Sequence, residues 1–100
     1  MPWPRLLALA LCALPAGARA ADDPVARSLA ATCASCHGTE GHSVSRDLPS
    51  LAGMRKEKIV ADLKAFRSGE RPATVMHQLA RGYTDAQIER VADYFAARKD

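Results

Sequence analysis

Two thiols and an imidazole lie within one run of five residues, Cys33-Ala34-Ser35-Cys36-His37. This Cys-x-x-Cys-His spacing is typical of covalent haem attachment, in which the two sulfurs add to the haem vinyl groups. The adjacent His37 then faces the iron as an axial ligand. The run therefore predicts one covalently bound haem c, in a protein that transfers electrons or senses a haem ligand.

Other chemistry of two cysteines and a histidine fits this run less well. Zinc fingers separate their ligand pairs by about a dozen residues, whereas the two cysteines here lie very close to His37 and His42. A disulfide between Cys33 and Cys36 would close a very small loop and would stabilise little. A thioredoxin-like thiol pair follows a strand, but the apolar residues before this run recur with the spacing of a helix. These three remain the alternatives to haem attachment.

A second axial ligand would bind on the face opposite His37. Four downstream residues are candidates for it: Met54, Met76, His42 and His77. Chain distance favours Met76, about forty residues after His37, because the chain can then pass around the haem edge. Its thioether is a soft, neutral ligand that raises the reduction potential relative to two imidazoles. A competing interpretation makes Met76 a core residue. The sixth coordination position of the haem iron would then be open, as in a haem enzyme or a gas sensor.

Residues 1–20 are predicted to be a secretory signal peptide that is cleaved after Ala20. Arg5 precedes a short apolar run, and Ala18-Arg19-Ala20 places small residues before the cleavage point. The apolar run is shorter than the roughly 20 residues that a membrane-spanning helix needs. We therefore expect export to the periplasm, with residues 21–100 forming one monohaem domain without a membrane span.

Charge and composition exclude some functions. The net charge is +3, and two of the basic residues, Arg5 and Arg19, leave with the predicted leader, so the remaining chain is close to neutral. Lys and Arg form no stripe interleaved with aromatic residues, so nucleic-acid binding is not predicted. Two Phe and two Tyr are the only aromatic residues after position 20. A core this small would gain apolar mass from a bound macrocycle.

Helices are expected to position these residues. No segment alternates apolar and polar residues as a half-buried strand would, so the predicted fold is all-α with four helices. Asp23 and Pro24 suit the start of a helix whose last residues are Cys33 to His37, the haem attachment run. The next residues up to Gly53 are predicted to be a loop, and residues 54–68 a second helix. A short helix beginning at Pro72 follows, and a capping box at Thr84 opens the last helix.

The order of these features resembles a class I cytochrome c. The helix ending in Cys-Ala-Ser-Cys-His-Gly is followed by Leu48-Pro49-Ser50-Leu51-Ala52-Gly53, a distant Met and a final helix with Tyr94-Phe95. The runs Leu-Lys-Ala-Phe-Arg-Ser-Gly-Glu-Arg at 63–71 and Leu-Ala-Arg-Gly-Tyr-Thr-Asp at 79–85 are most similar to the cytochrome subunit of periplasmic sulfide dehydrogenase, flavocytochrome c. The resemblance covers nearly all of residues 21–100 and implies the class I cytochrome c fold, with four helices around one covalently bound haem.

The resemblance also implies which residues hold the haem. It assigns six of them: Cys33, Cys36, His37, Met76, Pro49 and Leu51. The two cysteines would form thioether bonds, and His37 and Met76 would be the axial ligands of the haem iron. The Pro49 carbonyl would accept the second ring N–H of His37, fixing its tautomer, and Leu51 would lean on the macrocycle.

The function that the resemblance implies is single-electron transfer, with catalysis in a partner protein. The electron donor would be an FAD-containing sulfide dehydrogenase, and the acceptor another exported cytochrome or an oxidase. A freestanding soluble carrier that delivers electrons to a terminal oxidase or reductase is the alternative. Arg67 and Arg71 are candidates to bind haem propionates, because a guanidinium matches a carboxylate in a bidentate way. Ordinary surface placement is the alternative for both arginines.

Overall fold

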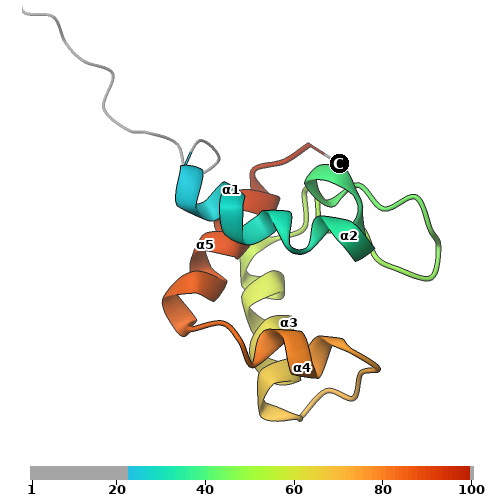
Figure 1. The fold of residues 1–100 in the computed structure, drawn as a ribbon, viewed down its shortest axis with the longest axis vertical. Helices are drawn as coiled ribbons and strands as arrows, with labels where there is room; N and C mark the ends of the chain where they lie inside the picture. Colours follow the sequence, from blue (N-terminus) through green and yellow to red (C-terminus); the bar gives the residue numbers. More distant parts are fainter. Residues whose placement is uncertain (1–22, 100) are drawn as a thin grey trace, which may run out of the picture.

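The protein is built from short helices, as its sequence predicts. The computed structural model describes residues 23–99, so the predicted signal peptide lies outside the described residues. The elements are α1 (Pro24–Ala31), α2 (Ala34–His37), the 3₁₀ turn η2 (Thr39–Gly41), α3 (Lys56–Ser68), α4 (Met76–Ala80) and α5 (Asp85–Ala96) (Figure 1). Residues 23–99 contain no strand, and none of their helices has the length and apolarity needed to cross a membrane. The all-α prediction is confirmed.

The first helix begins as predicted but ends before the attachment run. The Asp23 carboxylate accepts a hydrogen bond from the Val25 N–H at 2.9 Å, and Pro24 occupies the first turn. The prediction of one helix that continues into the attachment run is wrong, because α1 stops at Ala31 and α2 is separate. The break is a tightened turn, in which the N–H groups of Thr32 and Cys33 bond to the carbonyls three residues back at 3.4 and 3.0 Å.

Backbone contacts fix the long loop between α2 and α3. The Gly41 carbonyl accepts the N–H of Leu51 at 2.8 Å and that of Ala52 at 3.2 Å, and the Gly53 N–H donates to the Phe95 carbonyl at 2.9 Å. Gly41 has a φ of 83°, a left-handed conformation that favours glycine. A Cβ on Gly41 would lie 2.8 Å from both the Ala52 nitrogen and Cδ1 of Phe95. The loop is therefore folded tightly onto the end of α5.

The connection from α3 to α4 departs from its prediction. α3 starts at Lys56 rather than at Met54, a difference within the usual variation of helix ends. The prediction that Pro72 begins the next helix is wrong, because α4 begins only at Met76. The fixed φ of proline suits extended backbone as well as a first helical turn, and Val75 has non-helical angles of φ −133° and ψ −35°. Residues 72–75 are consequently an irregular segment that leads into α4.

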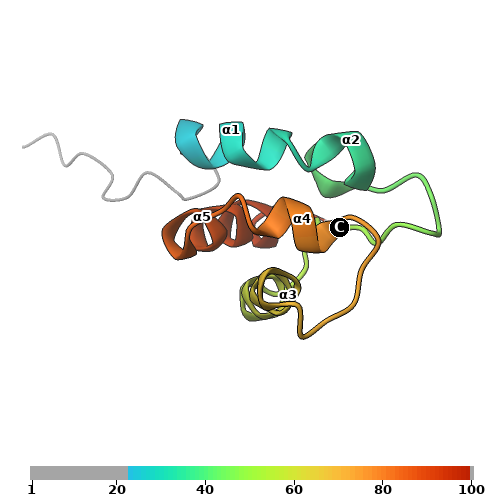
Figure 2. The same cartoon turned by 60° about the horizontal axis from the view of Figure 1, so that its bottom comes forward.

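α5 is the central helix of the core. The predicted capping box is present: Gln87 N–H donates to the Thr84 hydroxyl at 3.2 Å, and the Gln87 side chain accepts from the Thr84 N–H at 3.0 Å. α1 packs along one side of α5 and α3 along another (Figures 1 and 2). Ile88 and Phe95 of α5 are the largest fully buried side chains. Helices α1, α3 and α5 thus form a frame with α2 and α4 at its edge.

Candidate haem-binding site

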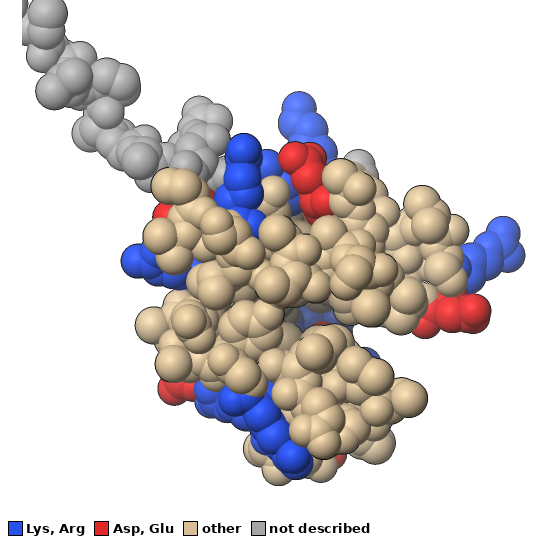
Figure 3. Space-filling view, viewed as in Figure 1, with Lys and Arg blue, Asp and Glu red and all other residues tan. Residues whose placement is uncertain are grey.

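A large apolar cavity opens between this frame and helices α2 and α4. Its volume is about 770 Å³, within the range of pockets that hold small molecules and cofactors. Its apolar lining includes Leu48, Leu51, Ile59, Leu63, Phe66, Leu79, Ile88 and Val91. Figure 3 shows the hollow on this face, with mostly uncharged surface around it. All six residues that the sequence assigns to haem contacts line this one cavity.

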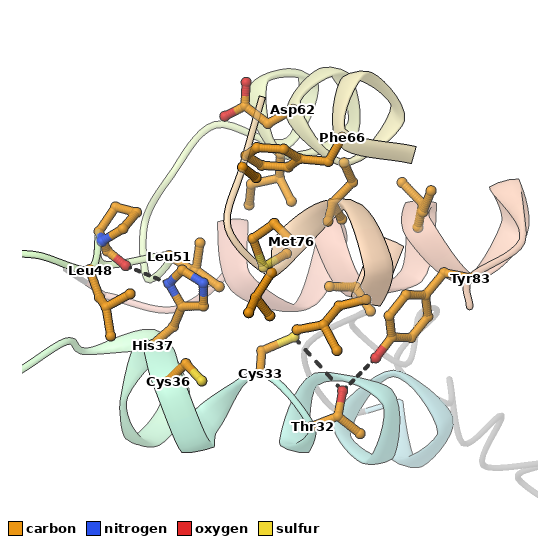
Figure 4. A pocket seen from close by; sticks show the side chains of 18 of the residues that line it. Thr32, Cys33, Cys36, His37, Leu48, Leu51, Asp62, Phe66, Met76 and Tyr83 are labelled. Atoms are coloured by element: carbon orange, nitrogen blue, oxygen red, sulfur yellow. Dashed lines mark hydrogen bonds between the residues drawn. The ribbon is translucent and has the colours of Figure 1, made fainter. Parts of the chain in front are cut away.

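His37 is held in one orientation by the loop that follows it. The side chain is 8% exposed, and its Nδ1 lies 2.8 Å from the carbonyl oxygen of Pro49. A carbonyl only accepts hydrogen bonds, so Nδ1 is the donor, and Nε2 is the ring nitrogen that can bind a metal. Figure 4 shows the His37 ring directed into the cavity. The hydrogen bond implied by the resemblance is therefore present, and it fixes the orientation of the ring with Nε2 left free of this contact.

The two cysteines lie on one short turn at the same edge of the cavity. Cys33 is half-buried and Cys36 is exposed, and both are free thiols. Burial raises the pKa of the Cys33 thiol, an effect that outweighs its contact with Thr32. Redox-active cysteine pairs usually contain a thiol of lowered pKa, so this direction is opposite to that of a thioredoxin-like site. The placement instead presents both sulfurs to a group inside the cavity.

The four candidates for a second axial ligand occupy different surroundings. Met76 and Met54 line the cavity, whereas His42 and His77 do not. Met54 also packs against the buried core cluster of α1, α3 and α5, and Met76 is not among the side chains packed there. Met76 enters the cavity from α4, while His37 enters it from α2 (Figure 4). Of the two methionines that line the cavity, Met76 is the one that does not pack against this cluster, and this favours Met76 as the second axial ligand.

Two polar residues at the cavity edge were not singled out from the sequence. Thr32, just before the attachment run, and Tyr83, just after α4, both line the cavity. Their hydroxyl oxygens are 2.5 Å apart. Tyr83 is one of few aromatic residues, which was the available signal for its importance. Nothing local in the sequence pairs Tyr83 with Thr32, about fifty positions away.

The zinc alternative finds no support in the geometry. Among residues 23–99, no group of three or more His, Cys, Asp or Glu side chains is close enough together to hold a metal ion. The attachment run and His42 therefore do not converge on a common point.

Comparison with known proteins identifies the family. A sequence model of the family described as cytochrome c oxidase, cbb3-type, subunit III matches residues 20–95. This chain belongs to the c-type cytochromes. The all-α structure, with the Cys-x-x-Cys-His run on the wall of an apolar cavity, agrees with a small class I cytochrome c. The family implies covalently bound haem c.

Individual relatives of this cytochrome are electron-transfer proteins by their names. It is 43% identical over 82 residues to the cytochrome subunit of sulfide dehydrogenase of Chlorobaculum tepidum, covering 78% of this chain and 74% of that protein. It is 39% identical over 67 residues to the thiosulfate dehydrogenase electron acceptor of Stutzerimonas stutzeri, covering 64% of this chain and 31% of that protein. It is 34% identical over 95 residues to cytochrome c4 of Pseudomonas aeruginosa, covering 94% of this chain and 46% of that protein. The relatives support electron transfer, and this chain spans less than half of the last two.

The residues of this cytochrome fit a covalently bound haem. Cys33 and Cys36 supply two thiols at one edge, and His37 supplies an imidazole nitrogen that is already oriented by Pro49. Met76 supplies a soft sulfur on another wall of the same apolar cavity. The cavity wall therefore carries a side chain of each kind that a six-coordinate haem c would need.

The two arginines proposed to bind haem propionates differ in position. Arg67 does not line the cavity, and it donates to the Tyr83 carbonyl at 3.2 Å and pairs with Asp85. Arg71 does line the cavity, pairs with Asp62 at 3.1 Å and lies 4.7 Å from the ring centroid of Phe66. Propionate binding by either arginine stays a prediction, and the position of Arg71 on the cavity wall favours Arg71 over Arg67.

Proposed function

We propose that this cytochrome transfers single electrons through one haem c bound by residues 21–100. Cys33 and Cys36 would form the two thioether bonds, and His37 and Met76 would be the axial ligands. When bound, haem c supplies an iron that is reduced and oxidised by one electron. The observation that carries the proposal is that these four side chains line one apolar cavity, in a sequence with one Cys-x-x-Cys-His run.

The side chains of this cytochrome have distinct tasks in that proposal. The Pro49 carbonyl orients the His37 ring and raises the basicity of its free nitrogen. Met76 contributes a soft, neutral thioether, which favours the reduced state and occupies the position that a small ligand would otherwise take. The apolar walls, Leu51 among them, exclude water from the site. These features suit electron transfer better than chemistry on a substrate.

Absorption of the ferric protein in the far red tests the ligand assignment. We expect a sulfur-to-iron charge-transfer band in the wild type and its loss in Met76→Ala. Met54→Ala is the matched control, because Met54 lines the same cavity but packs against the core. A wild type without the band, or a band that survives Met76→Ala, would contradict the assignment. Such a result would favour an open site, as in a haem enzyme or a gas sensor.

We further propose that the electron donor is an FAD-containing sulfide dehydrogenase, of which this chain is the haem subunit. The proposal rests on the 43% identity to the cytochrome subunit of sulfide dehydrogenase. Catalysis would then lie in the flavoprotein, and the acceptor would be another exported cytochrome or an oxidase. Purification from the native source at low salt should recover this chain with a flavin-containing subunit, and sulfide should reduce the haem of that complex. A flavin-free monomer, from cells that contain the flavoprotein, argues against the subunit.

A freestanding carrier is the second candidate. It is favoured by the 39% identity to a thiosulfate dehydrogenase electron acceptor and by the 32% identity to cytochrome c-554(548) of Halomonas halodenitrificans, 86% of which is covered. The same purification separates the two candidates. A carrier should be recovered as a flavin-free protein that accepts electrons from a dehydrogenase in solution, and that donates them to a terminal oxidase or reductase.

We also propose that this cytochrome is periplasmic and that residues 1–20 are removed after Ala20. The support is the order of Arg5, a short apolar run and the small residues of Ala18-Arg19-Ala20. Amino-terminal sequencing of the native protein should begin at Ala21, and fractionation should recover it with periplasmic proteins. A native protein that keeps residues 1–20 would contradict the proposal.

A further inference from the structure

One hydrogen bond connects the two walls that carry the predicted axial ligands. The hydroxyl oxygens of Thr32 and Tyr83 are 2.5 Å apart (Figure 4). Thr32 directly precedes the attachment run, and Tyr83 follows the short helix that begins with Met76. Within the described chain, no other hydrogen bond or ion pair joins residues 23–54 to residues 72–84. This bond is therefore the direct polar link across that edge of the cavity.

The direction of the bond follows from its neighbours. The Thr32 hydroxyl hydrogen is already used, because it donates to the Leu29 carbonyl at 2.8 Å. A hydroxyl has one hydrogen and two lone pairs, so Tyr83 donates and Thr32 accepts. The Cys33 sulfur lies 4.0 Å from the same Thr32 oxygen, and it would keep no hydrogen after thioether formation. Tyr83 would then be the side-chain donor to Thr32 in the haem-bound protein.

The segment that carries Met76 packs against α3 but has few hydrogen bonds to the rest of the protein. The backbone carbonyl of Tyr83 accepts a hydrogen bond from Arg67 at 3.2 Å. Ala80, at the end of α4, is 0% exposed. In contrast, every hydrogen bond that residues 72–78 make with described residues stays within residues 72–82. Packing against α3 holds one side of this segment, and the bond at Tyr83 is its polar contact with the wall that carries His37.

We propose that Tyr83 and Thr32 form a latch that keeps Met76 at the sixth position of the iron, which makes Tyr83 a positioning residue for the axial ligand. This inference rests on the proposed function, in which Met76 binds the iron. Loss of one hydrogen bond of ordinary strength should raise the fraction of protein with Met76 detached about 3- to 10-fold. An external ligand that competes with Met76 should then bind more tightly by the same factor.

Imidazole titration of the purified ferric haem protein tests the latch, with loss of the far-red sulfur–iron band as the readout. Tyr83→Phe removes the donor, and Thr32→Val removes the acceptor together with the bond from the Thr32 hydroxyl to the Leu29 carbonyl. Each should lower the apparent dissociation constant of imidazole about 3- to 10-fold, and the double variant should match either single one. Thr32→Ser keeps a hydroxyl and should restore the wild-type value. Tyr94→Phe, at a buried tyrosine that does not line the cavity, should leave it unchanged.

The outcomes separate the latch from the ligand assignment. A wild type without the sulfur–iron band overturns both. A wild type with the band, and with imidazole affinities unchanged in Tyr83→Phe and Thr32→Val, leaves Met76 as the ligand and overturns the latch. Additive effects of the two substitutions in the double variant also overturn the latch, because each single substitution already removes the bond between Thr32 and Tyr83. If Tyr83→Phe does not fold, Thr32→Val at an exposed side chain decides the question with the same readout.

Discussion

Gly41 and Gly69 form a matched pair that tests how the long loop is placed. Their φ angles are 83° and 82°, so an alanine would have a similar conformational cost at either position, about 1–2 kcal/mol. Their surroundings are different. A Cβ on Gly41 would lie 2.8 Å from the Ala52 nitrogen and from Cδ1 of Phe95, whereas a Cβ on Gly69 has no heavy atom within 4 Å.

Gly41→Ala should therefore reduce the free energy of unfolding more than Gly69→Ala does. The contacts at Gly41 cannot easily yield, because one partner is backbone and the other, Phe95, is 1% exposed. Overpacking of this kind adds about 1–3 kcal/mol, for a total of about 2–5 kcal/mol. Gly69→Ala should cost only its conformational part, about 1–2 kcal/mol. In a domain of this size, each kcal/mol lowers the Tm by about 4–8 °C.

Urea unfolding of both ferric variants, followed by circular dichroism, measures this difference. Potentiometry provides a second readout, because the Gly41 carbonyl holds the amides of Leu51 and Ala52 and so fixes the loop that contains Pro49. A looser bond from His37 to Pro49 makes the imidazole less basic, so Gly41→Ala should raise the reduction potential and Gly69→Ala should not. Equal losses of stability at the two glycines, or equal potentials, would refute this reasoning.

Four further predictions concern single side chains. Thr84→Ala removes the cap of α5 and should lower the free energy of unfolding by about 1 kcal/mol in urea, while Thr84→Ser should not. The Arg67 hydrogen bond lowers the pKa of Asp85 below 3.8, so this stabilisation is present above that pH and is lost as the pH falls through the folded-state pKa. Acid unfolding of Asp85→Asn should consequently be less steep below about pH 4 than that of the wild type. Met76→His should lower the reduction potential in potentiometry, since imidazole replaces a thioether. Cys36→Ala should shift the pyridine haemochrome spectrum to that of a single thioether, and an unchanged spectrum would count against attachment at Cys36.

Local chemistry made much of this fold predictable. The Asp23 cap and the capping box at Thr84 each act on their own helix, and both are present. The start of α4 was not predictable in this way, because Pro72 suits extended backbone as well as a first helical turn. The break at Thr32 is a tightened turn of backbone bonds to carbonyls three residues back, a choice that residue type alone does not decide.

The choice between Met54 and Met76 shows what required the structure. Spacing along the chain left both possible, and both side chains line the cavity. Met54 packs against the core formed by α1, α3 and α5, so turning its sulfur to the iron would remove buried contacts. Met76 lies on a five-residue helix that packs against α3, outside that core cluster. A place outside this cluster leaves Met76 available as a ligand, and the bond between Thr32 and Tyr83 is the hydrogen bond that joins its segment to the wall of His37, which explains why that distant pair should control ligand exchange.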